Sequence, residues 1–144
     1  MDLTILPKSW APHVLGLFRI MTGLLFLEHG TAKVLGFPSM PMADASHAFA
    51  MFTGGMELIG GLLIVVGFLT RPVAFILSGY MAVAYFMAHA PQGFFPALNH
   101  GEMAIMFSFA FLYFAAAGAG AWAVDTAVSA RTRHDEHFDA VSHA

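Results

Sequence analysis

The sequence predicts an all-α integral membrane protein, a four-helix transmembrane bundle with both termini cytoplasmic. Hydrophobic residues make up 58% of the 144 residues and charged residues only 10%, whereas an ordinary soluble domain has about 25% charged residues. The mean hydropathy is +0.72, so there are too few polar residues to cover an apolar core with a water-facing shell. Four apolar windows are each long enough to cross a bilayer core about 30 Å thick.

The four predicted helices cover residues 12–35, 47–69, 72–90 and 98–121. Two prolines and a glycine separate the first two helices and predict a short loop there. Pro72 fits the first turn of the third helix, because its missing N–H would be unpaired at that position anyway. The third break, residues 91–96, contains two adjacent phenylalanines that favour the membrane surface over open water.

Residues 1–125 are expected to form one transmembrane domain, followed by a polar tail over residues 126–144. The tail has too little apolar surface to fold alone and is predicted to be frayed or disordered. Orientation follows from the bias of Lys and Arg toward cytoplasmic segments. Four crossings place four basic residues on one side, against only Lys33 on the other, and so predict cytoplasmic termini. The four are Lys8, Arg71, Arg131 and Arg133.

Composition also argues against several classes of function. The chain has no cysteine, so any redox chemistry must use a cofactor or a partner protein. A net charge of −3 without a basic stripe makes nucleic acid an unexpected partner. No glycine-rich phosphate loop and no recognisable nucleophile motif occurs, which argues against nucleotide-dependent enzymes and hydrolases.

Polar and ionisable residues inside the predicted helices are the candidates for function, because each charge at a helix centre costs about 2.5–3.5 kcal/mol. Counting along the helices places most of them in the outer half of the membrane. They come from all four helices: Glu28, His29, Lys33, Glu57, His89, Asn99, His100 and Glu102.

Helical periodicity predicts which face of each helix turns inward. Small residues flank the charged ones, as close packing between transmembrane helices requires. The predicted inward faces are, in chain order, Gly16, Arg19, Gly23, Phe26, Gly30 and Lys33; Gly54, Glu57 and Gly61; Gly79, Ala82, Phe86 and His89; and Asn99, Glu102, Met106 and Phe109. Glu28 falls on the opposite side of its helix and is expected to face headgroups or another subunit.

Three interpretations of these residues remain open from the sequence. In the first, Arg19, Lys33, Glu57, His89 and Glu102 form a structural network that fixes helix register. In the second, the network surrounds a pocket for a small aromatic or quinone-like molecule. An imidazole can exchange protons near neutral pH, and phenylalanines can stack on a flat ring.

The third interpretation is a metal or haem site, since imidazole and carboxylate together suit zinc, iron or copper. Its candidate ligands are His29, His89, His100, Glu57 and Glu102. A pair of histidines at positions i and i+4, which would support this interpretation, is missing from every predicted helix.

Several short motifs, taken in order over residues 15–125, resemble the DoxX family of small four-helix bacterial membrane proteins. The motifs are Arg19 with Gly23, His29-Gly30-x-x-Lys33-x-x-Gly36-Phe37, Glu57-Leu-Ile-Gly60-Gly61, Gly67, Thr70-Arg71, Met81-Ala82-x-Ala84, His89, Gly93-Phe94-Phe95, Asn99, Gly101-Glu102, Gly118-x-Gly120 and Asp125. Glu28, His100 and the tail lie outside this pattern.

The resemblance implies a protein of the bacterial cytoplasmic (inner) membrane, linked to quinone-dependent redox processes and to oxidative stress. It also implies partner proteins of a membrane redox complex, and a homo-oligomer is a further possibility. Glu57, His89 and Glu102 are then the candidate catalytic residues, of which Glu57 and His89 would handle protons. The candidate ligand-binding residues are Arg19, His29, Lys33 and Asn99.

No intrinsic cofactor is expected under this interpretation, and a quinone is the expected ligand, with haem or a transition metal as the alternative. The sequence leaves open whether the chain turns over a substrate alone or acts as a subunit of a quinone-linked oxidoreductase, because it supplies no redox centre of its own. The competing class is a non-enzymatic membrane module that binds metal or haem, or scaffolds a redox complex.

Overall fold

The computed structural model describes residue 5, residues 7–39 and residues 46–132, and within these ranges it contains helices and no strand. The main helices agree closely with the first three predicted windows. In chain order the elements are η1 (Lys8–Trp10), α1 (Ala11–Leu35), α2 (His47–Val66), α3 (Thr70–Ala84), η2 (Tyr85–His89), η3 (Ala90–Gln92), α4 (Pro96–Asn99) and α5 (Glu102–Ala117). Residues 124–132 are also helical.

Three helical stretches are long and apolar enough to cross a membrane: Lys8–Leu35, His47–Val66 and Thr70–Gln92. The fourth predicted helix, 98–121, needs correction. His100 adopts a left-handed conformation with φ 57°, which separates α4 from α5, and Gly118 with φ 91° ends α5. The apolar helix α5 therefore has 16 residues, or about 24 Å at 1.5 Å per residue.

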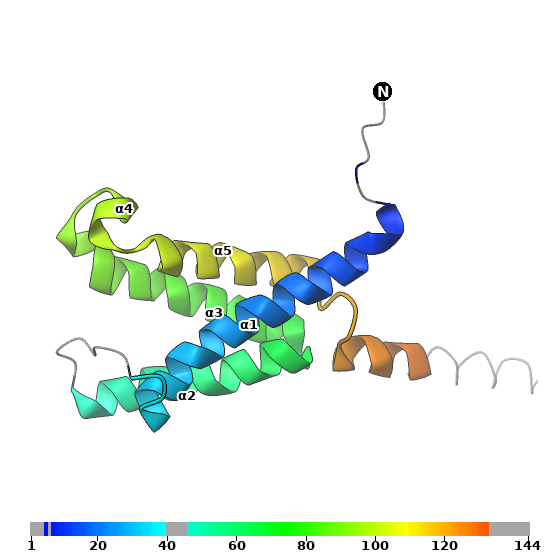
Figure 1. Ribbon diagram of the computed structural model, residues 1–144, viewed down its shortest axis with the longest axis horizontal. Helices are drawn as coiled ribbons and strands as arrows, with labels where there is room; N and C mark the ends of the chain where they lie inside the picture. The colour runs from blue at the N-terminus through cyan, green and yellow to red at the C-terminus, as the bar shows by residue number, and fades with distance from the viewer. Residues whose placement is uncertain (1–4, 6, 40–45, 133–144) are drawn as a thin grey trace, which may run out of the picture.

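The four longest helices are arranged as two antiparallel pairs, not as an evenly packed bundle (Figure 1). Helix α1 packs along α2, and α3 packs along α5. The pairs approach each other near the α2–α3 turn and diverge toward the opposite end, where α1 ends and α2 begins. This divergence leaves room for a cleft between the pairs.

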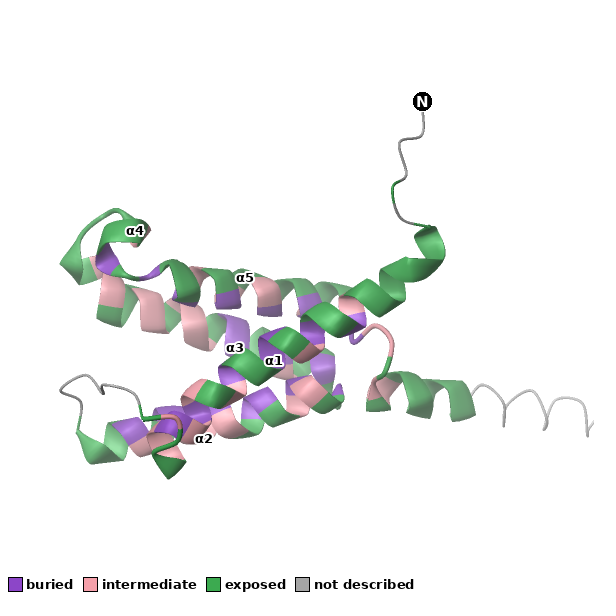
Figure 2. Ribbon diagram, in the orientation of Figure 1, coloured by how far each residue is buried: buried purple, intermediate pink, exposed green. Residues whose placement is uncertain are grey.

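Glycines bring α1 and α2 into close contact. A Cβ added at Gly30 would collide with the backbone of Leu58, and one added at Gly61 would lie 2.8 Å from the backbone nitrogen of Leu27. The inward faces predicted for these two helices are confirmed, because their glycines, Arg19 and Glu57 are buried (Figure 2). Small residues permit this approach in an apolar solvent, where burial of apolar side chains alone gives little gain.

A cluster of aromatic and aliphatic side chains packs the α3–α5 pair against the α1–α2 pair. Phe26 of α1 and Ile64 of α2 join Leu77 of α3 and Phe107 and Phe111 of α5 in one buried cluster. The inward faces predicted for the third and fourth helices are wrong in part. Among their members, Gly79, Phe86, Glu102, Met106 and Phe109 are exposed.

Charged side chains connect the helices at the end of the fold where the two pairs approach each other near the α2–α3 turn (Figure 1). We call this the narrow end. The carboxylate of Asp125 accepts hydrogen bonds from the backbone N–H groups of Leu69 and Thr70, each at 2.8 Å, and so caps the start of α3. Arg71 donates to carbonyls at the end of α5, including that of Ala116 at 2.6 Å. These contacts satisfy helix termini that would otherwise leave unpaired backbone groups.

The tail differs from its sequence prediction where the structure describes it. Residues 124–132 are helical, while the remainder of the predicted tail, 133–144, lies outside the described residues. Asp125 stands in the first turn of this helix, and its N–H donates to the carbonyl of Gly67 at 2.9 Å. The start of the helix is therefore held against the α2–α3 turn.

The close α1–α2 contact predicts a difference between two glycines. Gly30→Ala is expected to lower the free energy of unfolding by about 1–3 kcal/mol, because the new methyl group has no room against Leu58. Gly55 on α2 has open space around its Cα, so Gly55→Ala is expected to be neutral or to stabilise by up to about 1 kcal/mol. Denaturant unfolding in detergent micelles measures both, and equal effects would contradict the described packing.

Candidate functional site

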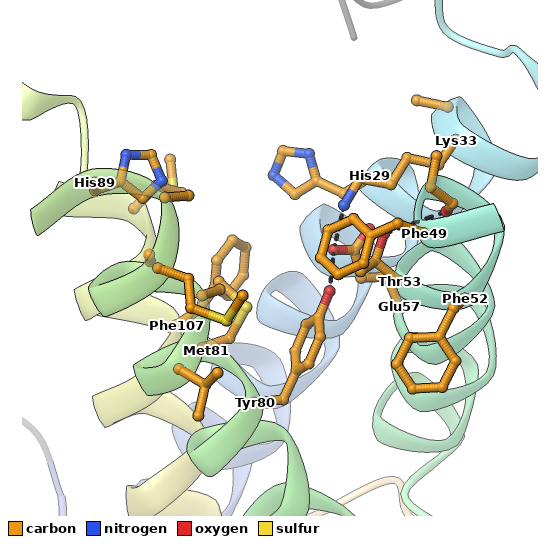
Figure 3. Close-up of a pocket in the computed structure, with 18 of the residues that line it drawn as sticks. His29, Lys33, Phe49, Phe52, Thr53, Glu57, Tyr80, Met81, His89 and Phe107 are labelled. Atoms are coloured by element: carbon orange, nitrogen blue, oxygen red, sulfur yellow. Dashed lines mark hydrogen bonds and ion pairs between the residues drawn. The ribbon is translucent and has the colours of Figure 1, made fainter. Parts of the chain in front are cut away.

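A cleft of about 660 Å³ lies between the two helix pairs at their diverging ends. Helices α1 and α2 form one wall, and α3, η2 and the start of α5 form the other (Figure 3). Most of its lining is apolar, with phenylalanine, methionine and alanine side chains predominating. Its volume is typical of sites that enclose a small organic ligand, about 300–1,000 Å³.

Three polar side chains from three helices meet in this apolar setting. The Nζ of Lys33 on α1 lies 2.6 Å from the Oε1 of Glu57 on α2, and the hydroxyl of Tyr80 on α3 donates to the same oxygen at 2.9 Å. We call Lys33, Glu57 and Tyr80 the carboxylate cluster. Because Tyr80 belongs to the second helix pair, its hydrogen bond to Glu57 joins the two walls of the cleft (Figure 3).

The carboxylate of Glu57 is incompletely paired. Glu57 is 5% exposed, and its second oxygen, Oε2, is buried without a hydrogen-bond partner in the described part of the chain. A buried acceptor left unpaired costs about 1–3 kcal/mol, and more when it is charged. Such an atom is a natural partner for a hydroxyl or N–H group that a ligand would bring into the cleft.

The close packing of α1 on α2 explains how Lys33 reaches Glu57. A Cβ at Gly54, one turn before Glu57, would lie 2.7 Å from the Cβ of Lys33, so only glycine lets the lysine stem run this near the helix. The side chain of Lys33 is 33% exposed, against 7% for that of Glu57. The pair therefore combines a buried carboxylate with an ammonium group that retains access to the mouth of the cleft.

His89 lies at the mouth of the cleft on the opposite wall, at the end of a π-helical turn (Figure 3). Its Nδ1 is 3.0 Å from the backbone carbonyl of Asn99. Since a carbonyl only accepts, Nδ1 must carry the hydrogen of this bond. The other ring nitrogen, Nε2, can then accept a hydrogen bond or take up a proton. The ring also stacks on Tyr85, with centroids 6.4 Å apart. Single π-helical turns inside α-helices occur frequently at functional sites.

The structure brings together four of the seven candidate catalytic and ligand-binding residues and separates the other three. Lys33, Glu57, His29 and His89 line the cleft. Asn99 is buried beside it, where its side chain bonds the backbone of Gly93 and Gly101 and shapes the loop.

Glu102 and Arg19 lie outside the cleft. Glu102 is exposed at the start of α5, and the hydrogen bond that orients the His89 ring is made to the backbone carbonyl of Asn99. Arg19 is fully buried at the narrow end, where its guanidinium donates to backbone carbonyls of α2 and of the segment after α5. Its observed contacts are structural, consistent with the first interpretation of the sequence for this residue.

Sequence reasoning missed Tyr80 and Thr53. Both line the cleft, and Tyr80 completes the carboxylate cluster. A tyrosine near the middle of an apolar helix was the available signal, because a buried hydroxyl needs a hydrogen-bond partner. Thr53 gave a weaker signal, since its hydroxyl is satisfied within its own helix by the carbonyl of Ala50 at 3.2 Å.

The candidate metal ligands do not converge. Within the described residues, no group of three or more His, Cys, Asp or Glu side chains could hold a metal ion. His29, His89 and His100 line the cleft together with Glu57, but His29 and Glu57 belong to the α1–α2 wall and His89 belongs to the facing wall (Figure 3). The donor set therefore does not fit a multidentate metal site.

The chain is a helical membrane protein, because apolar helices of membrane-spanning length surround a cleft that contains an ion pair with a buried carboxylate. It belongs to the DoxX family, whose profile matches residues 14–90. The matched stretch contains the carboxylate cluster and His89. The family resemblance seen in the sequence is thereby confirmed.

One relative is an uncharacterized protein of Haemophilus influenzae. It is 44% identical over 124 residues, a stretch that covers 82% of this chain and 92% of the relative. No solved structure matches the chain significantly. The likeness to the Haemophilus influenzae protein extends over most of both chains.

Proposed function

We propose that this DoxX protein binds a quinone or a related redox-active aromatic molecule in the cleft, and serves quinone-linked redox metabolism and the response to oxidative stress. The observation that carries the proposal is the half-paired carboxylate of Glu57 in an otherwise apolar, aromatic-rich cleft. A quinol or catechol hydroxyl would donate to Oε2 of Glu57. Its flat ring suits the phenylalanine side chains of the walls, such as Phe49 and Phe107.

The other polar groups of the cleft match the remaining chemistry of such a ligand. The ammonium of Lys33 can donate to a quinone oxygen, and Nε2 of His89 can take up or release a proton at the mouth. Oxidation of a quinol also releases two electrons. Because the chain has no cysteine and supplies no redox centre, we assign the electrons to a partner redox protein in the membrane.

The proposed setting is the cytoplasmic membrane of a bacterium, which the chain crosses four times with both termini inside. The bias of Lys and Arg toward the narrow end supports this orientation, since Lys8, Arg71 and Arg131 all belong to that end of the helices. The cleft then opens toward the outer leaflet, where quinones can diffuse. A redox-complex partner or a homo-oligomer would pack on the lipid-facing helices.

Binding of a short-tailed quinol tests the proposal, because the reduced form has the hydroxyl that donates to Glu57. Glu57→Gln removes the charge but keeps the shape, and it is expected to weaken binding of a short-tailed quinol by about 10- to 100-fold, the effect of one charge-assisted hydrogen bond. Glu102→Gln is the matched control, because this exposed carboxylate lies outside the cleft, and it should leave affinity unchanged. Calorimetric titration of the detergent-solubilised protein measures both.

Two outcomes would count against the proposal. If Glu57→Gln lowered thermal stability and binding in parallel, the carboxylate cluster would be a structural network, as in the first interpretation of the sequence. A Soret band or stoichiometric metal in the purified protein would instead favour the metal or haem module. An absorption spectrum and elemental analysis before the titration separate these cases.

A further inference from the structure

We propose that the ligand of the cleft is a membrane-resident quinone with a hydrocarbon tail, and that the tail leaves the cleft sideways between α2 and α3. We call this route the lateral opening and define it by Phe52, Val83 and Met87, which edge it. The inference rests on the proposed function, because it names the class of quinone and the path that it takes. It distinguishes a lipid-soluble ligand from a small water-soluble one.

The size of the cleft favours a ligand larger than a ring. Its volume of about 660 Å³ lies well inside the range of about 300–1,000 Å³ for sites that hold drug-sized ligands. A bare benzoquinone is a single six-membered ring with two oxygens, which is smaller than such a ligand. The remaining lining is apolar, so hydrocarbon is the chemistry that fits the rest of the space.

The lateral opening begins where the contact between α2 and α3 stops. A Cβ added at Gly60 would lie 2.8 Å from Leu77, so the two helices touch there and close the floor of the cleft. About two turns earlier in α2, Phe52 lines the cleft and is 66% exposed. On the facing helix, Val83 and Met87 also line it and are 56% and 66% exposed.

Residues that line a cleft and are also open on the outer surface mark a route between the two. In a helix of apolar composition that spans a bilayer, such exposed side chains face lipid. The three side chains of the lateral opening are large and apolar. Among the described residues that line the cleft, no charged residue lies beside them at the edge between α2 and α3. A hydrocarbon tail can lie across them without burying any polar group.

The opposite edge of the cleft, between α1 and α5, has a different character. His29, Lys33 and His100 line it, with Met103 as its large exposed apolar side chain. Imidazole and ammonium groups suit the polar headgroup region and the oxygens of a ring, and they would be costly beside a tail. The asymmetry places the ring toward α1 and α5 and the tail toward α2 and α3.

Photo-crosslinking tests the route. A quinone with a diazirine in its alkyl tail is added to the protein in lipid nanodiscs and irradiated, and the labelled residues are identified by mass spectrometry. Label is expected on Phe52, Val83 or Met87, and excess unlabelled tailed quinone should suppress it by about tenfold. Val83→Trp fills the opening and is expected to lower the label by about tenfold.

Ile76→Trp is the matched control, because Ile76 is an exposed aliphatic residue of the same helix outside the cleft. It should leave labelling unchanged. Competed label on His100 or Met103 would overturn the lateral route and leave the proposed function standing. A tail-less quinone that binds as tightly as the tailed one would overturn the assignment of a tailed ligand. If neither quinone competes and neither binds, the proposed function fails as well.

Discussion

Arg19→Ala is expected to destabilise the protein by about 3–5 kcal/mol, more than the loss of any one charged hydrogen bond. The guanidinium of Arg19 is fully buried and donates to five backbone carbonyls. These carbonyls belong to Ile64, Val65, Ala119, Ala121 and Trp122. Alanine would leave a cavity and several unpaired acceptors at the point where α1, α2 and the segment after α5 meet.

Arg71 supplies the matched control for this prediction. It also donates to carbonyls at a helix end, those of Ala115, Ala116 and Ala117, but it is exposed. Water or headgroups can replace its bonds, so Arg71→Ala is expected to cost about 1 kcal/mol or less. Arg19→Lys keeps the charge with at most three donors and should fall between the two. Similar unfolding midpoints for Arg19→Ala and Arg71→Ala would contradict the structural role of Arg19.

The second large effect is expected at Lys33. Lys33→Met leaves the carboxylate of Glu57 buried with only the Tyr80 hydroxyl as partner, and breaking a buried pair in this way costs about 3–5 kcal/mol. Glu57→Gln should cost less, because the side chain of Lys33 is one third exposed and can turn its ammonium toward the mouth. Replacing Lys33 is therefore expected to lower the stability of the protein more than replacing Glu57, although the two residues form one ion pair.

A double variant separates stability from binding at this pair. Lys33→Met combined with Glu57→Leu removes both charges, and it is expected to recover most of the stability that Lys33→Met alone loses. It should not recover quinone binding, since the proposed acceptor is gone. Thermal unfolding in detergent and quinone titration are measured on the same samples. A double variant as unstable as Lys33→Met would argue against the described pairing.

The sequence predicted the first two helices and their buried faces well, for a physical reason. Glycines and charges alternate with large apolar residues on α1 and α2, so one face differs clearly from the other. Gly30, Gly54 and Gly61 mark close contacts in the structure, and they point to Glu57 and Lys33. Two members of the carboxylate cluster could therefore be found without coordinates.

The faces of α3 and α5 were harder to predict, because lipid accepts the same apolar residues that a protein core does. Phenylalanine occurs on both sides of α5, buried at Phe107 and Phe111 but exposed at Phe109. The prediction also assumed one continuous helix from residue 98. The left-handed conformation at His100 breaks it and resets the helical phase, so Glu102 does not share a face with Asn99.

The π-helical turn has a similar effect at the end of α3. It adds a residue to the turn and rotates the residues after it, so His89 lines the cleft although Gly79 and Phe86 of the predicted face are exposed. Regular helical periodicity therefore predicts correctly that His89 lines the cleft, but the continuous helical face on which it placed His89 does not exist in the structure. A prediction from regular helical periodicity cannot include such a turn, which covers Tyr85–His89 in the structure.

A structure of the protein in nanodiscs with a tailed quinone in its reduced, quinol form would test the central claim most directly. We expect density for a flat ring between the two helix pairs, with a ring hydroxyl that donates to Glu57 Oε2 at an oxygen–oxygen distance of about 2.7 Å. Density for the quinone elsewhere on the protein, with lipid chains filling the cleft and no ligand atom near Glu57, would contradict it.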